Sequence, residues 1–301
     1  MTNSFSKGWY AILAISEVKR KPISIERFGV NIVVWLSNQQ EVIVMEDSCP
    51  HRSAKLSLGK ICNGNITCPF HGFQFNKDGQ CVYAPEFNKP IPGLKTKVFK
   101  VKIEVGMVWL YYGSSEEPLI IDPLITLYKD FNFSYSFTTK IWKSHITRCI
   151  ENQLDYTHLS FVHSNTIGRN FHIPEKLKFI KNVNEIKVLK EENKDPFFEY
   201  IFPNAWILHI SNKIKLIVYF VPIKDDKTKF YLFTYRKFLN QKFLKPVIDY
   251  IFNISNKIIL KQDQKIVESQ GNKPSYLANN ELLMFHDTAI RIFRELWQNK
   301  L

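Results

Sequence analysis

Long hydrophobic runs are missing from this chain of 301 residues, and so is any sign of a secretory leader. The most apolar stretch, residues 246–260, predicts an amphipathic helix and no membrane span, because polar residues interrupt it at Asp249, Asn253, Asn256 and Lys257. The amino terminus has no basic segment followed by an apolar one, so no signal peptide is expected. The cysteines number only five, an odd count, which indicates reduced thiols and a cytoplasmic location.

Signatures of nucleotide and nucleic-acid binding are also missing. There is no Gly-x-Gly-x-x-Gly fingerprint and no flavin-binding pattern, so the chain is not expected to bind NAD(P)H or a flavin itself. The net charge of +13 comes with lysines scattered singly, without a basic run or a nucleic-acid motif. Solvated lysines are the simplest interpretation, and a basic docking face for an acidic electron carrier is the alternative. No nucleic-acid partner is expected.

Two mixed pairs of cysteine and histidine stand out in the first third of the chain. They are Cys49-Pro-His51 and Cys68-Pro-Phe-His71, and neighbouring glycines and prolines place both in tight loops. Two thiolates and two imidazoles are the ligand set of a Rieske [2Fe–2S] cluster, in which histidines replace the cysteines on one iron. Tetrahedral zinc is the competing interpretation, but its sites usually pair cysteine with cysteine and histidine with histidine. The mixed pairs therefore favour the cluster.

The length and an apolar content of 45% allow two domains, each with its own core. Strands around the ligand loops are predicted from β-branched and aromatic segments at 10–15, 32–36, 42–45 and 98–112. A polar, turn-forming stretch at 113–118 predicts a boundary, with one domain at 1–117 and the other at 118–301. In the second domain we expect helices at 142–162 and from 246 onward, and strands at 177–189, 198–210, 214–223 and 230–236. The pattern predicts an α+β protein.

A second group of potential ligands lies in the predicted helix at 142–162. Asp155 and His158 are three residues apart and would share a helix face, so the carboxylate can orient the imidazole. His163 lies about 140° away from His158 on an ideal helix, so the helix must distort or end there, and 166–168 is a plausible stop. Two histidines and a carboxylate on one side of Fe(II) leave positions open for O2 and substrate. A histidine pair alone is more often structural, but beside the cluster motif an iron centre is favoured.

Together, the two motifs resemble those of the α subunits of Rieske non-haem iron oxygenases. The segments that carry the resemblance are Cys49-Pro-His51-Arg, Cys68-Pro-Phe-His71-Gly-Phe, Gly79-x-Cys81 and Asn152-x-x-Asp155-x-x-His158-x4-His163. The resemblance implies an N-terminal antiparallel β Rieske domain, a C-terminal domain in which a curved antiparallel sheet grips a long helix, and a homotrimer. The similarity is nearest to the short-chain monooxygenase branch, which includes vanillate and dicamba O-demethylases.

The resemblance further implies a carboxylate ligand on a later helix, and Asp263 is the best candidate. It lies on the apolar stripe of its own helix with Ile259, Ile266 and Val267, where an unpaired charge is costly. Metal coordination would compensate that cost, whereas Glu268 falls on a more polar face. A buried salt bridge is the alternative role for Asp263.

For Asp155 the resemblance implies a role other than metal binding. In the family, the cluster of one chain delivers electrons to the iron of a neighbouring chain, and an aspartate bridges the two sites. Carried over to this sequence, His71 of one chain would hydrogen-bond Asp155 of the next, and Asp155 would hold His158.

The implied activity is that of a terminal oxygenase. It would take electrons from NAD(P)H only through a separate reductase, with or without a ferredoxin. With them it would use O2 to hydroxylate or oxidatively demethylate a small substrate. An aromatic content of 14% suggests a ring-containing molecule, although much of it builds the core. The alternatives are a cis-dihydroxylating dioxygenase, an electron carrier that uses only the cluster, and a redox-inactive relative. The carrier would leave His158, His163 and Asp263 without a purpose.

Several other residues are assigned structural roles. Cys81 has no partner thiol in the pattern, and the same interpretation covers four histidines, His145, His172, His209 and His286. A substrate pocket lined from the strands by His209, Tyr219 and Tyr235 is the weaker hypothesis. An apolar stripe predicted to pack on the sheet consists of Leu282, Phe285, Ala289, Phe293 and Leu296.

Overall fold

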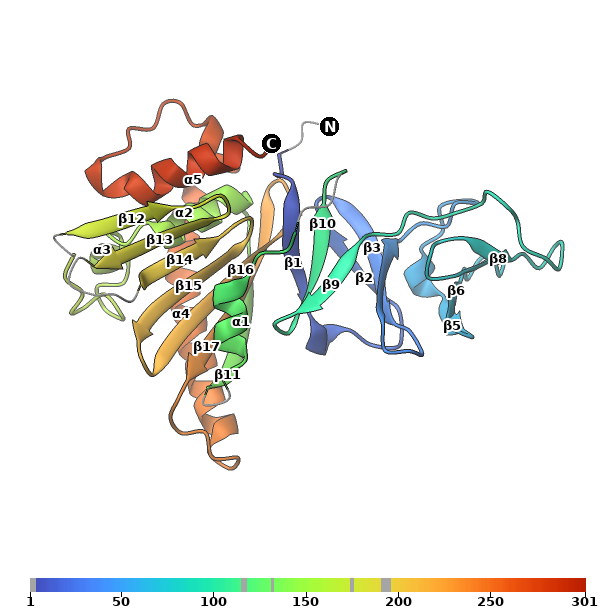
Figure 1. Cartoon of the computed structure of the whole chain (residues 1–301), viewed down its shortest axis with the longest axis horizontal. Helices are drawn as coiled ribbons and strands as arrows, with labels where there is room; N and C mark the ends of the chain where they lie inside the picture. The colour runs from blue at the N-terminus through green and yellow to red at the C-terminus, as the bar shows by residue number, and fades with distance from the viewer. Residues whose placement is uncertain (1–3, 115–117, 131–132, 174–175, 191–195) are drawn as a thin grey trace. The chain divides into compact units, whose positions relative to one another are not determined.

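The computed structural model describes residues 4–114, 118–130, 133–173, 176–190 and 196–301 (Figure 1). The chain divides into two compact units, Trp9–Tyr112 and Gly113–Leu301, and the first residues through Gly8 belong with the second unit. The boundary predicted between residues 117 and 118 falls at 115–117, which lie outside the described residues, so that division stays a prediction. No helix in the described ranges is long and apolar enough to span a bilayer.

The first unit consists of short antiparallel strands in three sheets. One sheet has the order β1-β10-β9, with bounds Gly8–Ala14, Met107–Tyr112 and Val101–Glu104. The second has the order β2-β3-β4, with bounds Ile23–Arg27, Val30–Leu36 and Val42–Glu46. The third, order β5-β6-β7-β8, comprises Lys60–Cys62, Asn65–Thr67, Gln74–Phe75 and Cys81–Tyr83. The single strand predicted at 98–112 is a hairpin, because Val105 and Gly106 both have positive φ and form a turn.

The second unit is built on one antiparallel sheet of seven strands in the order β11-β17-β16-β15-β14-β13-β12. Their bounds are Ser134–Trp142 for β11, Leu177–Lys181 for β12, Glu185–Lys190 for β13, Pro196–Ile201 for β14, Ala205–Ser211 for β15, Ile214–Lys224 for β16 and Lys227–Arg236 for β17. The helices are α1 (Asp122–Tyr128), α2 (Ile146–Leu154), α3 (Leu159–Val162), α4 (Lys245–Ser269) and α5 (Thr288–Gln298). The predicted α+β class is confirmed.

The long helix α4 runs along one face of the seven-stranded sheet (Figure 1). Polar contacts hold it there, since Asn256 donates to Thr234 Oγ1 at 2.9 Å and Thr138 donates to Asn253 Oδ1 at 2.7 Å. The buried stripe of α4 follows helical spacing and comprises Asn256, Leu260, Asp263 and Val267. The sequence placed Asp263 on the buried stripe with Ile266, but Ile266 is 45% exposed and lies to one side of that stripe.

Two predicted helices are shorter than the sequence suggested. The helix expected over 142–162 breaks between α2 and α3, because Asp155 takes an extended conformation as the C-cap of α2. Between the end of α4 and the start of α5 at Thr288, the described chain has only two short 3-10 helices, Ser275–Leu277 and Phe285–Asp287. The predicted stripe is therefore wrong at its start: Leu282 and Phe285 are exposed, whereas Ala289, Phe293 and Leu296 are buried.

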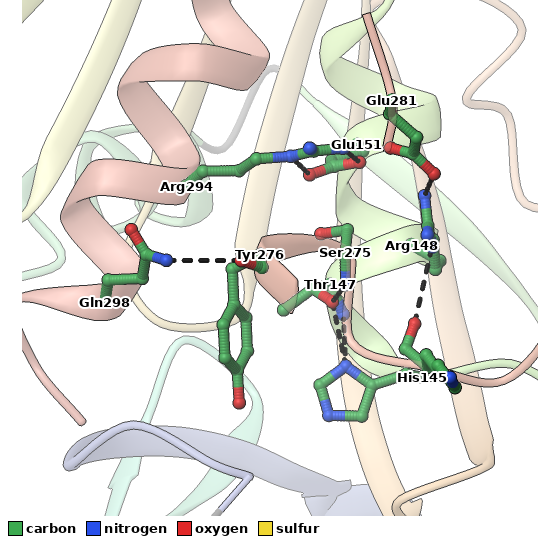
Figure 2. A network of polar contacts seen from close by, with 10 residues as sticks. His145, Thr147, Arg148, Glu151, Ser275, Tyr276, Glu281, Arg294 and Gln298 are labelled. Atoms are coloured by element: carbon green, nitrogen blue, oxygen red, sulfur yellow. Dashed lines mark hydrogen bonds and ion pairs between the residues drawn. The ribbon is translucent and has the colours of Figure 1, made fainter. Parts of the chain in front are cut away.

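Ion pairs fix α2 against α5 and the segment between α4 and α5 (Figure 2). Arg294 binds both oxygens of Glu151, at 2.7 and 3.0 Å, and Glu281 bridges Arg148 and Arg294 with contacts of 2.6 Å. Burial raises the pKa of the Glu151 carboxyl even though Arg294 favours the carboxylate. The network sets the position of the carboxyl end of α2, where the second group of candidate ligands begins.

Candidate metal centres

The two cysteine–histidine loops of the first unit have the same backbone construction. In the first, Cys49 N–H donates to Ala54 O and Ser53 N–H donates to Cys49 O, both at 2.8 Å. In the second, Cys68 N–H donates to Phe73 O at 2.8 Å and Gly72 N–H donates to Cys68 O at 3.0 Å. Ser53 and Gly72, each four residues after its cysteine, share a positive φ. The structure thus presents the two motifs as a matched pair of tight loops.

The sulfur and nitrogen donors of these loops differ in how deeply they are buried. Both thiols are buried and adjacent, and desolvation together with the neighbouring Cys68 raises the pKa of Cys49 to about 11. The imidazoles of His51 and His71 are exposed, with ring centroids 4.8 Å apart. Paired buried thiolates need a cation beside them, and a two-iron cluster would offer one iron to the inner thiolates and the other to the outer imidazoles.

The burial of the four donors bears on the zinc alternative. The two thiols are buried and the two imidazoles are exposed, so the donors separate into a sulfur pair and a nitrogen pair. A tetrahedral zinc ion needs all four donors around one point, whereas a two-iron cluster would take each pair on a separate iron. The separation therefore favours the cluster.

Packing around the loops explains nearby sequence features. Cys81 is buried in the hydrophobic core beneath the loops, among residues that include Trp35 and Phe75. Its thiol donates to Tyr83 O at 3.6 Å, which agrees with the structural role predicted for it. Gly72 lies against Pro85, where a Cβ would come within 2.9 Å of Cγ, so this position of the second loop excludes side chains.

In the second unit, His158, His163 and Asp263 form a compact group whose donor atoms all lie within 4.8 Å of one another. Asp263 Oδ1 is 2.9 Å from His163 Nε2 and 3.5 Å from His158 Nε2. Asp263 and His163 are almost fully buried, at 2% and 1% exposed. A carboxylate and two imidazole nitrogens that converge in a dry site match the donors of a facial iron site. Elsewhere in the described ranges no other group of three such side chains comes as close.

The breaks in the chain bring these residues together. His158 is the N-cap of α3 and His163 is its C-cap, so the short helix carries one imidazole at each end. The turn after His163 closes back, with Thr166 N–H and Gly168 N–H donating to His163 O at 2.8 and 3.0 Å. A Cβ at Gly168 would lie 1.8 Å from Leu159 O. α3 ends at Val162, so the predicted end of the helix at His163 is confirmed. Glycine at position 168 is required for the close packing of the turn that follows.

Asp155 lies beside His158, but the two do not share the face of one continuous helix as predicted. The turn between α2 and α3 brings them together. Asp155 Oδ1 accepts hydrogen bonds from Thr157 N and Thr157 Oγ1 at 2.8 and 2.7 Å. Its Oδ2 faces His158 Nδ1 at 3.7 Å. Burial acts to raise the pKa of Asp155, but the His158 and Thr157 contacts outweigh it, and the net shift is downward. The side chain is held as a carboxylate.

The sequence analysis did not foresee several contacts made by this group and by Tyr156, which follows Asp155 in the chain. Gln262 accepts from His163 Nδ1 at 2.9 Å, and Tyr156 shares a hydrogen bond of 3.0 Å with His286 Nδ1. Phe197 packs near Tyr156 and stacks on Phe171. His286 comes from a segment 130 residues after Tyr156, so no local pattern could reveal the pair. Gln262 directly precedes Asp263, the predicted ligand, so its place next to the site could have been inferred from the sequence.

His209 points away from this centre. Residues paired across neighbouring strands point to the same face of the sheet. Thr234, which contacts α4, is paired with Leu216, and Leu216 is paired with Leu208, so Leu208 lies on the α4 face. His209, the next residue along the strand, therefore faces the other side. There it bonds Glu199 at 2.7 Å and Lys215 at 3.0 Å, at the edge of a cavity of about 840 Å³. Tyr219 and Tyr235 share that face by strand alternation. The hypothesis that these three residues line an iron-side pocket is therefore wrong.

Comparison with known proteins places both units in known families. Residues 8–101 match the Rieske [2Fe-2S] domain, and residues 142–207 match the vanillate O-demethylase oxygenase C-terminal domain. Among curated relatives, aminopyrrolnitrin oxygenase PrnD of Pseudomonas fluorescens is 30% identical over 179 residues, covering 54% of this chain and 47% of that protein. Methylxanthine N1-demethylase NdmA of Pseudomonas putida is 26% identical over 88% of this chain and 81% of its own length. The chain spans about half the length of the first curated relatives it matches.

Solved structures share the fold over nearly the whole chain. Dicamba monooxygenase bound to dicamba superposes with a TM-score of 0.79 at 20% identity, covering 97% of both chains. Pseudomonas putida CBB5 NdmA in a variant with theobromine gives a TM-score of 0.82 at 23% identity, covering 95% of this chain and 88% of that chain. The Rieske match precedes the oxygenase C-terminal match, the order expected for a Rieske oxygenase α subunit. The chain belongs to the Rieske non-haem iron oxygenases.

Proposed function

We propose that the protein is the terminal oxygenase of a multicomponent monooxygenase, acting by hydroxylation or oxidative demethylation. The observation that carries this proposal is the convergence of His158, His163 and Asp263 at a buried point in a chain that also has a Rieske domain. Relatives named as monooxygenases and demethylases support the same reaction class. An electron carrier would have no use for the second group.

Each donor set has a separate role in this proposal. Cys49, Cys68, His51 and His71 hold the [2Fe–2S] cluster, and His158, His163 and Asp263 hold one Fe(II). When bound, the two groups supply electron storage and O2 activation, respectively. The protein keeps the Asp263 site dry, which strengthens the interaction of the carboxylate with a cation.

Asp155 is the proposed bridge between the cluster of one chain and the iron site of the next. Its Oδ1 is already occupied by Thr157, so Oδ2 is the oxygen that serves His158 and one further donor. The exposed imidazole of His71 from a neighbouring chain would be that donor, which requires a homotrimer or another closed ring. The carboxylate side chain is 30% exposed, as a bridge to another chain needs.

The remaining partners follow from the same proposal. A separate reductase, with or without a ferredoxin, supplies the electrons, and a small ring-containing molecule is the substrate. Tyr156 follows Asp155 in the chain and packs near Phe197, which stacks on Phe171, and aromatic side chains of this kind would suit such a ring. The cysteines, all of them described, are free thiols, which supports a reducing compartment and a cytoplasmic location.

A single-turnover reaction tests the function directly. Reduced, iron-replete protein is exposed to O2 with a panel of methoxylated, N-methylated and unsubstituted ring compounds, and products are measured by mass. Formaldehyde with loss of a methyl group identifies a demethylase, and a gain of one oxygen identifies a hydroxylase. A gain of two oxygens and two hydrogens would contradict the monooxygenase proposal in favour of a dihydroxylase. Absence of product with every compound, together with a reducible cluster, would favour the carrier.

A further inference from the structure

Gln262 precedes Asp263 on α4, and its amide lies on the far side of the His163 ring. Its Oε1 is 2.9 Å from His163 Nδ1 and 3.1 Å from Thr166 Oγ1. His163 Nε2 faces Asp263 Oδ1 at 2.9 Å. Two consecutive residues of one helix therefore hold the two nitrogens of a ring that is only 1% exposed. Water has little access to replace either contact.

We infer that Gln262 is a positioning residue that commits His163 Nε2 to the metal, an inference that rests on the proposed iron site. An amide oxygen only accepts hydrogen bonds, so the 2.9 Å contact is donated by His163 Nδ1–H. Nε2, the nitrogen 2.9 Å from Asp263 Oδ1, is then the one that can give a lone pair to a metal in place of a proton. The opposite orientation of the amide would place the ring hydrogen on Nε2 and leave no lone pair there for a metal. Partners of this kind fix the tautomer and the orientation of metal-binding histidines.

The two imidazoles of the site have different partners. His158 Nδ1 faces the charged Asp155 Oδ2 at 3.7 Å, whereas His163 Nδ1 contacts a neutral amide at 2.9 Å. The contact to Gln262 is the shorter one and comes from the helix that also carries Asp263. Gln262 therefore serves metal retention, while Asp155 is left for the link to the neighbouring chain. Substitutions at the two positions should produce different defects.

Metal titration separates this role from a general structural one. The mononuclear site is emptied by a chelator under conditions that keep the cluster absorbance, and Co2+ is titrated while its visible spectrum is recorded. Gln262→Leu removes the acceptor, and we expect affinity to fall by about 10- to 100-fold with an altered Co2+ spectrum. Gln262→Glu keeps an oxygen acceptor and should restore the affinity and spectrum of the natural protein.

Gln264→Leu is the matched control, because it makes the same change two residues along α4. The Gln264 amide donates to Ile141 O at 3.2 Å and to Glu268 at 2.7 Å, and it does not contact His163. This variant should bind Co2+ like the natural protein. The inference is overturned if Gln262→Leu binds as tightly as Gln264→Leu, or if Gln262→Glu is as weak as Gln262→Leu. Failure of the natural protein to bind Co2+ or Fe2+ would instead overturn the proposed metal site itself.

Discussion

Replacing Arg294 by methionine tests whether the ion-pair network in Figure 2 holds α2, and with it the metal site, in place. Arg294 binds both oxygens of Glu151, whose side chain is 9% exposed. Removing one partner of a buried pair leaves an uncompensated charge and costs about 3–5 kcal/mol. Arg148 also lowers the energy of the Glu151 carboxylate, so we expect the lower end, about 3 kcal/mol.

The sign of the pH dependence follows from the same pair. Burial already raises the pKa of Glu151, and loss of Arg294 raises it further. The folded variant then keeps a proton that the unfolded chain loses near pH 4.5, so its stability should decrease as pH rises above about 4.5. The loss caused by Arg294→Met should therefore be largest at neutral pH and smaller in mild acid.

Urea denaturation measures both effects. Tryptophan fluorescence and cluster absorbance are followed separately, because two compact units need not unfold together. The double variant Glu151→Leu with Arg294→Met leaves no buried charge from the pair and should regain most of the lost stability. A loss below about 1 kcal/mol for Arg294→Met, the range of a surface pair, would refute the reasoning. So would a double variant no more stable than the single one.

Three further predictions concern the site and its scaffold. Asp155→Asn should keep both metal groups, because an amide oxygen still accepts from Thr157, yet abolish turnover; normal steady-state turnover would contradict the bridging role. Asp263→Ala should lower bound iron from about three to about two per chain with labile sulfide unchanged, and unchanged iron would exclude Asp263 as a ligand. Burial lowers the pKa of His145 from 6.5 to about 4, so its contribution to stability should be lost as pH falls from about 6.5 to 4, by about 3 kcal/mol at most. His145→Asn keeps a cap for Thr147 N–H and should flatten that part of the stability curve; an equally steep curve would contradict the assignment.

The sequence predicted the candidate ligands better than it predicted the elements that carry them. Cys49, His51, Cys68 and His71 belong to short loops whose spacing is fixed locally, and such spacing is visible in a sequence. The family resemblance implied a carboxylate on a later helix, and Asp263 was chosen there because a charge on an apolar helix stripe is costly. Its burial agrees with that reasoning. Their roles as ligands stay predictions until metals are measured.

Features set by distant contacts were the ones missed or mistaken. The break at Asp155 depends on the bonds that Thr157 makes to it and on packing of α3, so helical periodicity alone extended the helix through it. His286 reaches Tyr156 from the far end of the chain, and no local pattern reports such a pairing. His209 was placed on a strand correctly, but the face it occupies depends on the register of β15 with β16.

Iron and acid-labile sulfide analysis of the purified natural protein beside a His163→Ala variant tests the central claim most directly. The account predicts about three irons and two sulfides per chain in the natural protein, and loss of one iron with both sulfides retained in the variant. Two irons and two sulfides in both proteins, after reconstitution with Fe(II), would show a cluster without a second iron centre and contradict the proposed oxygenase.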